Sequence, residues 1–388
     1  MRVAIITENF LPKLDGVTRT LARLLEHLQA NGHQALLLGP ESGMEEYAGA
    51  EVIGTAGLPF PFYPELKFNF FRPLFMRRLH EFRPDILHLV DPVILGATGL
   101  AAARLFNIPI ISSYHTNLAA YCEHFGFSLL TKPMWLYNSF VHNQCSLTFC
   151  PSQSTATMLQ KQGFEHLRIW PRGVDMDLFY PERKSAEVRA SWLQERTDPE
   201  QKTVLLYVGR VSWEKNLRLL IQAYREMDHS RCHLVIVGHG PAYAEVEQEL
   251  SNVPVTFTGY LSGEALATAY ASADVFAFPS YTETFGQVVL EAMASGLPVV
   301  GVRSEGVCDL VQSGQTGLLL DAETMNEDEQ IRGYRAYLEQ LVVDEQMRIQ
   351  MKQAAHAAAL GRSWYEAMEC LVRGYYEVVE QMQLQEVA

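Results

Sequence analysis

The chain has 388 residues, of which 48% are hydrophobic and 20% charged, and its formal net charge is −14. This length and composition favour two or three globular domains, and the negative charge argues against nucleic-acid binding, which needs a basic surface. No apolar run approaches the ~20 residues of a membrane-spanning helix, and the six cysteines form no Cys-x2-Cys pair. We therefore expect a cytoplasmic protein with scattered reduced thiols.

Short apolar runs alternate with helical patterns in the first half of the chain. A helix is predicted at residues 18–31, because leucines recur there on one helical face and Gly32 follows as a C-cap. A second helix is predicted at residues 92–106. Strands are predicted at residues 2–7, 34–39, 51–54, 86–90, 110–114 and 147–151. This alternation implies a parallel, doubly wound sheet.

A second alternating region follows a polar segment at residues 176–202, which contains Pro181 and Pro199. Strands are predicted at residues 203–208, 233–237, 255–258, 275–279 and 299–302, each followed by a helix. The pattern indicates another Rossmann-like domain. We therefore predict an N-terminal domain at residues 1–176, a C-terminal domain at residues 177–363 and a helical tail at residues 364–388. Two such domains are expected to bind a ligand in the cleft between them.

The most informative segment follows the strand at residues 275–279 and reads Tyr281-Thr-Glu-Thr-Phe-Gly-Gln-Val-Val-Leu-Glu291. It leads into a predicted helix, whose N-terminus would suit a phosphate. Glu283 precedes the helix and Glu291 lies inside it, an offset of about 12 Å and roughly 80° in ideal geometry. The two carboxylates therefore suit two parts of one extended ligand. A capped loop and a solvated helix face are the alternative.

Basic residues follow the first strand of the second half, in the sequence Gly209-Arg-Val-Ser-Trp-Glu-Lys215. Arg210 supplies a rigid fork and Lys215 a point charge, and the two together suit a diphosphate. The alternative is a solvated surface pair. Val237-Gly-His-Gly-Pro241 ends another strand, where Gly238 and Gly240 would let a ligand approach the backbone closely. A plain tight turn would also explain these glycines.

These segments together resemble retaining glycosyltransferases of the GT4 type. Their E-x7-E signature is met by Glu283 and Glu291, and their G-R-x4-K pattern by Gly209, Arg210 and Lys215. The resemblance spans nearly the whole chain. The segments 114–116, 132–135 and 172–175 look most like sulfoquinovosyltransferases and glycolipid mannosyltransferases that act on diacylglycerol-type acceptors.

The resemblance implies an α/β protein of the GT-B fold. Its two Rossmann-like doubly wound domains face each other across a cleft, and the C-terminal helix crosses back to the first domain. The N-terminal domain would hold the acceptor and the C-terminal domain the nucleotide-sugar donor. By the same resemblance, the catalytic residues are His115, Arg210, Lys215 and Glu283. The donor-binding residues are Gly16, Arg172, Gly209, Gly238, Gly240, Tyr260, Thr284, Phe285, Gly286, Gln287 and Glu291.

His115 is either a catalytic residue or a structural one, because a histidine at a strand end is most often a satisfied structural group. It lies in Ser113-Tyr-His-Thr-Asn117, where the resembled family has a histidine near the sugar and the reaction centre. Its expected work is positioning and dipolar stabilisation. Arg172 could add a third positive charge at the pyrophosphate.

The expected reaction moves a hexose from a UDP- or GDP-linked sugar to a hydroxyl group, with retention, by front-side attack. No cofactor and no metal are expected, because positive side chains would meet the phosphate charge. The expected acceptor is a lipid or another hydrophobic molecule. The alternatives are a soluble small-molecule or natural-product acceptor, a GT-B sugar-nucleotide epimerase, and a non-catalytic nucleotide-sugar-binding protein. The motifs do not specify the nucleobase, the sugar or the acceptor.

Aromatic and basic residues occur together in the first half, at residues 58–64, 67–72 with Arg77 and Arg78, and 125–132. Such segments can dock peripherally on an anionic bilayer. The alternative is that these aromatics form core or line a groove for a hydrophobic acceptor, and the net charge opposes membrane contact.

Overall fold

The computed structural model describes residues 1–12, 16–60, 63–69, 72–119, 122, 127–193 and 202–387. The chain divides into two compact units. Unit 1 comprises Met1–Arg172 and Trp364–Ala388, and unit 2 comprises Gly173–Ser363. The division falls after Arg172, whereas the sequence placed it after residue 176. Unit 1 is discontinuous in sequence, because the last helix belongs to it.

The main sheet of unit 1 has the order β10-β9-β8-β7-β1-β2-β4-β3 in the described residues. Its strand pairs are parallel except for β3 with β4. The strands are β1 Arg2–Thr7, β2 Gln34–Pro40, β3 Glu46–Tyr47, β4 Ala50–Thr55, β7 Ile86–Val90, β8 Ile110–Ser113, β9 Leu147–Cys150 and β10 Leu167–Ile169. A separate antiparallel pair is formed by β5 Gly57–Phe60 and β6 Tyr63–Asn69.

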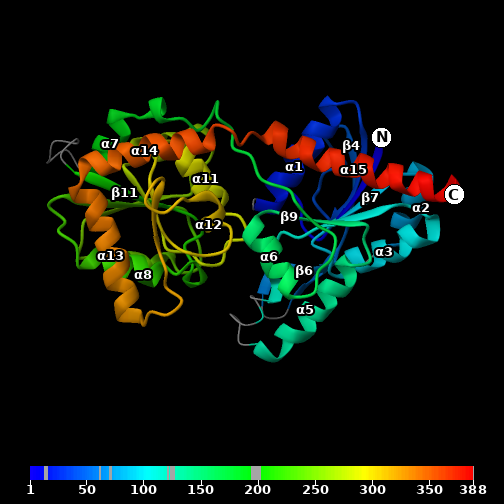
Figure 1. The fold of residues 1–388 in the computed structure, drawn as a ribbon, viewed down its shortest axis with the longest axis horizontal. Helices are drawn as coiled ribbons and strands as arrows, with labels where there is room; N and C mark the ends of the chain where they lie inside the picture. The colour runs from blue at the N-terminus through cyan, green and yellow to red at the C-terminus, as the bar shows by residue number, and fades with distance from the viewer. Residues whose placement is uncertain are drawn as a thin grey trace. The chain divides into compact units, whose positions relative to one another are not determined.

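The helices described in unit 1 are α1 Gly16–Ala30, α2 Pro73–Phe82, α3 Ile94–Phe106, α5 Ser128–His142, α6 Gln153–Lys161 and α15 Trp364–Val387. Figure 1 shows α15, in red, beside α1, in blue. α15 buries Met368, Leu371 and Tyr375 in one core cluster with β1 and α1 residues. The last helix is therefore part of the core of the first unit.

Unit 2 contains a parallel sheet of order β13-β12-β11-β14-β15-β16. Its strands are β11 Thr203–Val208, β12 Cys232–Val237, β13 Val255–Gly259, β14 Val275–Phe278, β15 Val299–Val302 and β16 Gly317–Leu320. Its described helices are α7 Ala186–Leu193, α8 Leu217–Arg225, α9 Tyr243–Glu249, α10 Gly263–Ser272, α11 Gln287–Ala294, α12 Val307–Leu310, α13 Glu327–Val343 and α14 Glu345–Ala359. Short 3-10 turns occur at Pro181–Arg183 and Trp213–Lys215.

β11 explains why strands of unit 2 read as continuous apolar runs. Val204, Leu206 and Val208 join one core cluster, whereas Leu205 and Tyr207 join another. Since successive side chains of a strand point to opposite faces, β11 is buried on both sides. The doubly wound architecture predicted for each half is therefore confirmed.

None of the described helices is both long and apolar enough to cross a membrane. Parts of the predicted segments lie outside the described residues: residues 13–15 before Gly16, and residues 61–62, 70–71 and 125–126 of the aromatic segments.

Candidate active site

Lys215 and Glu283 meet at the carboxyl ends of two neighbouring strands of unit 2. β11 pairs with β14, so the loops that follow them begin at the same edge of the sheet. The Lys215 Nζ atom lies 2.6 Å from Glu283 Oε1, and each side chain is 20% exposed. Ser280 Oγ also donates to Glu283 Oε1, at 3.2 Å. The fold thus brings together two residues that the sequence predicted separately for the phosphates and the sugar.

Two further hydrogen bonds join the same loops. Asn216 Nδ2 donates to the Pro279 carbonyl at 3.1 Å, and Thr282 Oγ1 donates to the Glu214 carbonyl at 3.5 Å. Tyr207 Oη donates to the Arg210 carbonyl at 2.9 Å and so fixes the backbone just after β11. Arg210 and Lys215 are therefore presented by one loop whose path is set by hydrogen bonds on both sides.

Packing explains why positions 238 and 240 are glycine, a reason that the sequence alone did not show. A Cβ atom at Gly238, where φ is 132°, would lie 1.9 Å from the Gly209 carbonyl oxygen. A Cβ atom at Gly240 would lie 2.4 Å from the Val211 carbonyl oxygen. The loop after β12 therefore packs directly on the backbone after β11, and only glycine fits at both places. Donor binding by these glycines stays a prediction.

Gly16, the first residue of α1, is a contrasting case in unit 1. A Cβ atom there would meet no described atom within 4 Å. Packing within the described residues does not require glycine at this position. Its predicted place near the donor stays a prediction.

The N-terminus of α11 is held by packing on one side and a hydrogen bond on the other. A Cβ atom at Gly306 would lie 2.6 Å from the backbone of Phe285, so this loop lies tightly against Gly306. Gln287 Nε2 donates to the Gly173 carbonyl at 3.0 Å. Gly286 occupies the N-cap position with a φ of 88°, which favours glycine. The end of the loop that follows Thr284 is thereby fixed.

Glu291 has a different environment from Glu283. Its side chain lies on α11, is 4% exposed and accepts a hydrogen bond from Tyr270 Oη of α10 at 3.2 Å. Tyr260, by contrast, follows β13 and is 57% exposed. The two carboxylates of the predicted signature therefore have separate partners, and their roles toward a ligand stay predictions.

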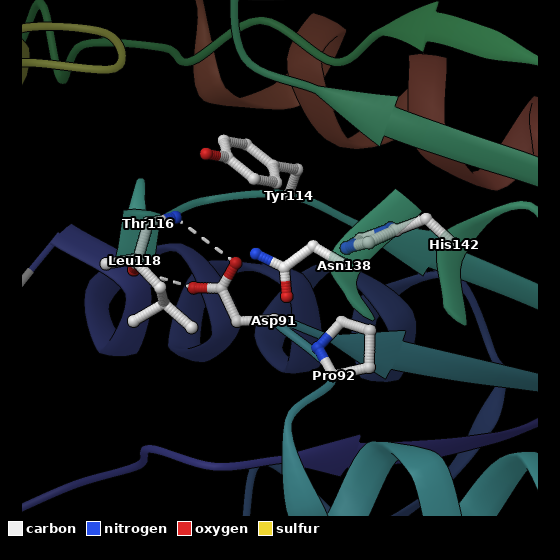
Figure 2. Close-up of a pocket in the computed structure, with 7 residues that line it drawn as sticks. All are labelled: Asp91, Pro92, Tyr114, Thr116, Leu118, Asn138 and His142. Atoms are coloured by element: carbon white, nitrogen blue, oxygen red, sulfur yellow. Dashed lines mark hydrogen bonds between the residues drawn. The ribbon is translucent and has the colours of Figure 1, made fainter. Parts of the chain in front are cut away.

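His115 follows β8 in unit 1, on a loop that is shaped by Asp91 from the end of β7. Asp91 Oδ1 accepts from the backbone N–H groups of His115 and Thr116, at 2.6 and 3.1 Å. Asp91 Oδ2 accepts from Thr116 Oγ1 at 2.7 Å. Figure 2 shows this carboxylate aimed at Thr116, beside Asn138. The cavity drawn there has a volume of only about 10 Å³, room for about one water.

Both ring nitrogens of His115 are hydrogen-bonded within unit 1. Arg172 Nη2 lies 2.9 Å from Nδ1, and Ser113 Oγ lies 2.8 Å from Nε2. The Arg172 guanidinium also stacks on Trp170 at 4.4 Å and donates to the Trp170 carbonyl at 3.0 Å. Arg172, predicted at the pyrophosphate, thus contacts the predicted catalytic histidine.

Burial sets the charge of this pair. Desolvation, with a smaller effect of Arg172, holds the pKa of His115 well below its ordinary value. Desolvation also lowers the pKa of Arg172, to about 10, which leaves the guanidinium charged at neutral pH. His115 is therefore a neutral ring beside a cation, which suits positioning and dipolar stabilisation better than proton abstraction.

Several polar residues of unit 1 were missed by the sequence reasoning. Ser113 Oγ contacts His88 Nε2 at 2.7 Å, and His88 Nδ1 contacts Tyr375 Oη at 2.8 Å. A histidine inside the apolar strand at residues 86–90 was the available signal. Glu8, after β1, was also missed. Its Oε1 accepts from the backbone N–H of Leu95 at 2.6 Å and so caps α3.

The described residues contain no group of three or more His, Cys, Asp and Glu side chains arranged to hold a metal ion. The expectation that the reaction needs no metal stays a prediction.

Comparison with known proteins identifies the class. Residues 14–178 match Glycosyltransferase Family 4, and residues 188–358 match Glycosyl transferases group 1. The fold is similar to that of Anabaena Alr3699/HepE, solved in complex with UDP and glucose. The TM-score is 0.74 at 20% identity, over 97% of this chain and 100% of that chain. The two parallel-sheet units and their matched domains define a glycosyltransferase of the GT-B fold.

Relatives in sequence define the family. The chain is 35% identical to the GDP-mannose-dependent alpha-mannosyltransferase of Corynebacterium glutamicum, over 98% of this chain and 89% of that protein. It is 35% identical to the sulfoquinovosyl transferase SQD2 of Arabidopsis thaliana, over 79% and 61%. It is 26% identical to the alpha-monoglucosyldiacylglycerol synthase of Streptococcus pneumoniae, over 83% and 76%. The chain belongs to the GT4 family of glycosyltransferases, which confirms the resemblance seen in its motifs.

Proposed function

We propose that the protein is a retaining hexosyltransferase that moves a sugar from a nucleoside-diphosphate sugar to a hydroxyl of a lipid or other hydrophobic acceptor. The observation that carries the donor side is the Lys215–Glu283 contact of 2.6 Å at the carboxyl edge of β11 and β14. It supports the proposal because a cation, suited to a phosphate, lies beside a carboxylate that can accept hydrogen bonds from sugar hydroxyls.

Each residue of the proposed site has one role in the sugar transfer. Arg210 and Lys215 neutralise the diphosphate as it leaves, and the N-terminus of α11 adds backbone N–H groups. Glu283 orients the sugar, and Glu291 holds the ribose. His115 stabilises the sugar as positive charge develops on it. The acceptor attacks from the face that the diphosphate leaves, and a leaving phosphate oxygen takes its proton. Because Arg210, Lys215 and the N-terminus of α11 meet the phosphate charge, the transfer needs no metal.

The first donors to test are GDP-mannose and the UDP-hexoses, because the relatives and the solved structure name GDP-mannose and UDP. Purified protein is mixed with each donor and with diacylglycerol, monoglycosyl diacylglycerol or a soluble phenolic acceptor. Transfer to a lipid with an α-linkage from an α-linked donor is the expected result. Transfer only to the soluble acceptor would overturn the lipid assignment. Conversion of the donor to an epimer without transfer would overturn the reaction.

A membrane contact is proposed for α5, which presents a cationic and apolar face. Leu129 is 91% exposed, Leu136 71% and Phe140 62%. With Lys132 they are spaced by three or four residues, so they lie on one face of the helix. The helix contains no acidic residue, in a chain with a net charge of −14. This face suits an anionic bilayer, in which leucine and phenylalanine insert while lysine meets the head groups.

Vesicle co-sedimentation tests this contact. Protein should sediment with vesicles that contain phosphatidylglycerol and much less with pure phosphatidylcholine. The double variant Leu129→Ser/Leu136→Ser should lose this binding and keep donor binding. The control is Leu384→Ser, which changes a leucine on α15 that is 72% exposed, about as exposed as Leu136. Equal sedimentation of the double variant and the control would contradict the proposal.

A further inference from the structure

Five buried polar side chains of unit 1 form a continuous hydrogen-bonded chain from Arg172 to the last helix. The successive contacts are Arg172 to His115 at 2.9 Å, His115 to Ser113 at 2.8 Å, Ser113 to His88 at 2.7 Å and His88 to Tyr375 at 2.8 Å. β7 supplies the inner histidine, β8 the serine and α15 the tyrosine. The chain therefore links a helix at the end of the sequence to the loop after β8.

The direction of the first two hydrogen bonds follows from the chemistry of arginine. A guanidinium only donates, so Nδ1 of His115 must be the acceptor. A neutral imidazole then has its proton on Nε2, from which it donates to Ser113 Oγ. The arrangement selects one tautomer and one ring orientation of His115.

Water cannot replace the inner members of this chain. Ser113, His88 and Tyr375 are each 0% exposed. A buried polar group that loses its partner keeps the full cost of desolvation, so each member is strongly held by the next. The Tyr375 hydroxyl holds His88, His88 holds Ser113, and Ser113 accepts the Nε2 proton of His115.

We propose that Tyr375 is a positioning residue that acts through His88 and Ser113 to hold the reactive ring of His115 in one orientation, while Arg172 selects the tautomer of that ring. The inference rests on the proposed glycosyl transfer and on the role of His115 in it. It assigns a part in the reaction to α15, whose Tyr375 is 260 residues from His115 in sequence.

The ring of Tyr375 can be separated from its hydroxyl. The ring packs edge-on against His88, with centroids 5.8 Å apart, and lies in the cluster with Met368 and Leu371. Tyr375→Phe keeps this packing and removes only the hydrogen bond. The matched control is Tyr334→Phe, which removes an equally buried hydroxyl from unit 2, where it donates to the Val300 carbonyl.

Steady-state kinetics should separate the two variants. Tyr375→Phe should lower kcat about tenfold and leave the donor KM nearly unchanged, because the donor is bound by unit 2. Tyr334→Phe should leave both constants near wild type. Ser113→Ala removes the direct partner of His115 and should lower kcat at least as much. Because Tyr375→Phe and Ser113→Ala break the same series of hydrogen bonds, the double variant should have a kcat within about twofold of that of Ser113→Ala alone. If the effects of the two single substitutions on kcat multiplied in the double variant, the proposal would be overturned.

Nitrogen-15 NMR of histidine-labelled protein gives a readout that needs no activity. The His115 signals, assigned from their loss in His115→Asn, should report a neutral ring with its proton on Nε2. In Tyr375→Phe the ring should stay protonated on Nε2, because Arg172 still donates to Nδ1, but the Nε2 signal should shift as its hydrogen bond to Ser113 weakens. Tyr334→Phe should leave both signals unchanged. An Nδ1-protonated or charged ring in the wild type would overturn the positioning chain. Absence of transfer with a normal His115 signal would instead refute the proposed function.

Discussion

Replacing Lys215 by methionine should separate phosphate binding from sugar binding at the donor site. Lys215 Nζ lies 2.6 Å from Glu283 Oε1, and both side chains are 80% buried. A bound diphosphate that loses a cationic partner of this kind loses about 2–3 kcal/mol of binding free energy, or roughly 30- to 150-fold in Kd. Glu283→Gln should leave the affinity for UDP or GDP nearly unchanged and should lower the rate of sugar transfer.

The same pair predicts a pattern in stability. Charge-assisted hydrogen bonds contribute about 1.5–3 kcal/mol. Because a fifth of each side chain reaches solvent, we expect Lys215→Met to cost about 1–2 kcal/mol. The double variant Lys215→Met/Glu283→Gln should recover much of that loss, because the unpaired carboxylate is gone, and should still bind the nucleotide weakly.

Calorimetry with UDP and GDP, beside thermal unfolding, measures both effects. The matched control is Lys352→Met, since Lys352 is another partly buried lysine of unit 2, 4.0 Å from Asp274. Its nucleotide affinity should remain within about twofold of wild type. Unchanged nucleotide affinity in Lys215→Met would refute the assignment of this lysine to the phosphates.

Three further predictions concern catalysis, metal and pH. His115→Ala should lower kcat by roughly 10²-fold, about 2.7 kcal/mol, with little change in donor Kd; a near-normal kcat would leave His115 a structural residue. Transfer should continue in excess EDTA, and activity that vanishes with chelator and returns with Mg²⁺ or Mn²⁺ would contradict the metal-free reaction. Burial lowers the pKa of His88 and His142 to about 3, from an ordinary 6.5. Their neutral rings stabilise the fold fully above pH 6.5, and this is lost as the pH falls toward 3, by about 1.4 kcal/mol per pH unit for each ring. The free energy of unfolding, measured in urea, should therefore fall steeply from pH 7 to pH 4, and it should fall less steeply in His142→Gln.

The sequence predicted the fold where strands are long, apolar and buried on both faces, as β11 and β12 are. It missed β10, Leu167–Ile169, because three residues interrupted by Arg168 give little apolar pattern. It also missed β16, Gly317–Leu320. It also missed the antiparallel pair β5–β6, whose segment was interpreted by its aromatic content.

Site residues could be predicted where they belong to a local motif. They could not be predicted where their role depends on a hydrogen-bond partner that is distant in sequence. Glu283 and Lys215 were each found in a motif, although their direct contact spans 68 residues. His88 and Tyr375 belong to no motif, and the hydrogen bonds of His88 to Ser113 and to Tyr375 span 25 and 287 residues, beyond the reach of any local pattern. The glycines at 238 and 240 were found, but their packing against the backbone after β11 was not, since no local pattern encodes a contact between two loops.

The discontinuity of unit 1 has a consequence for biosynthesis. Its core includes Met368, Leu371 and Tyr375, which leave the ribosome after all of unit 2 has been made. N-terminal domains usually fold first during synthesis. Here unit 2 can finish folding before unit 1 does. Unit 2, continuous from Gly173 to Ser363, can form its sheet while unit 1 still exposes the surface that α15 covers. The nascent first half should thus be the segment that engages chaperones, and it should become protease-resistant only after α15 has left the ribosome.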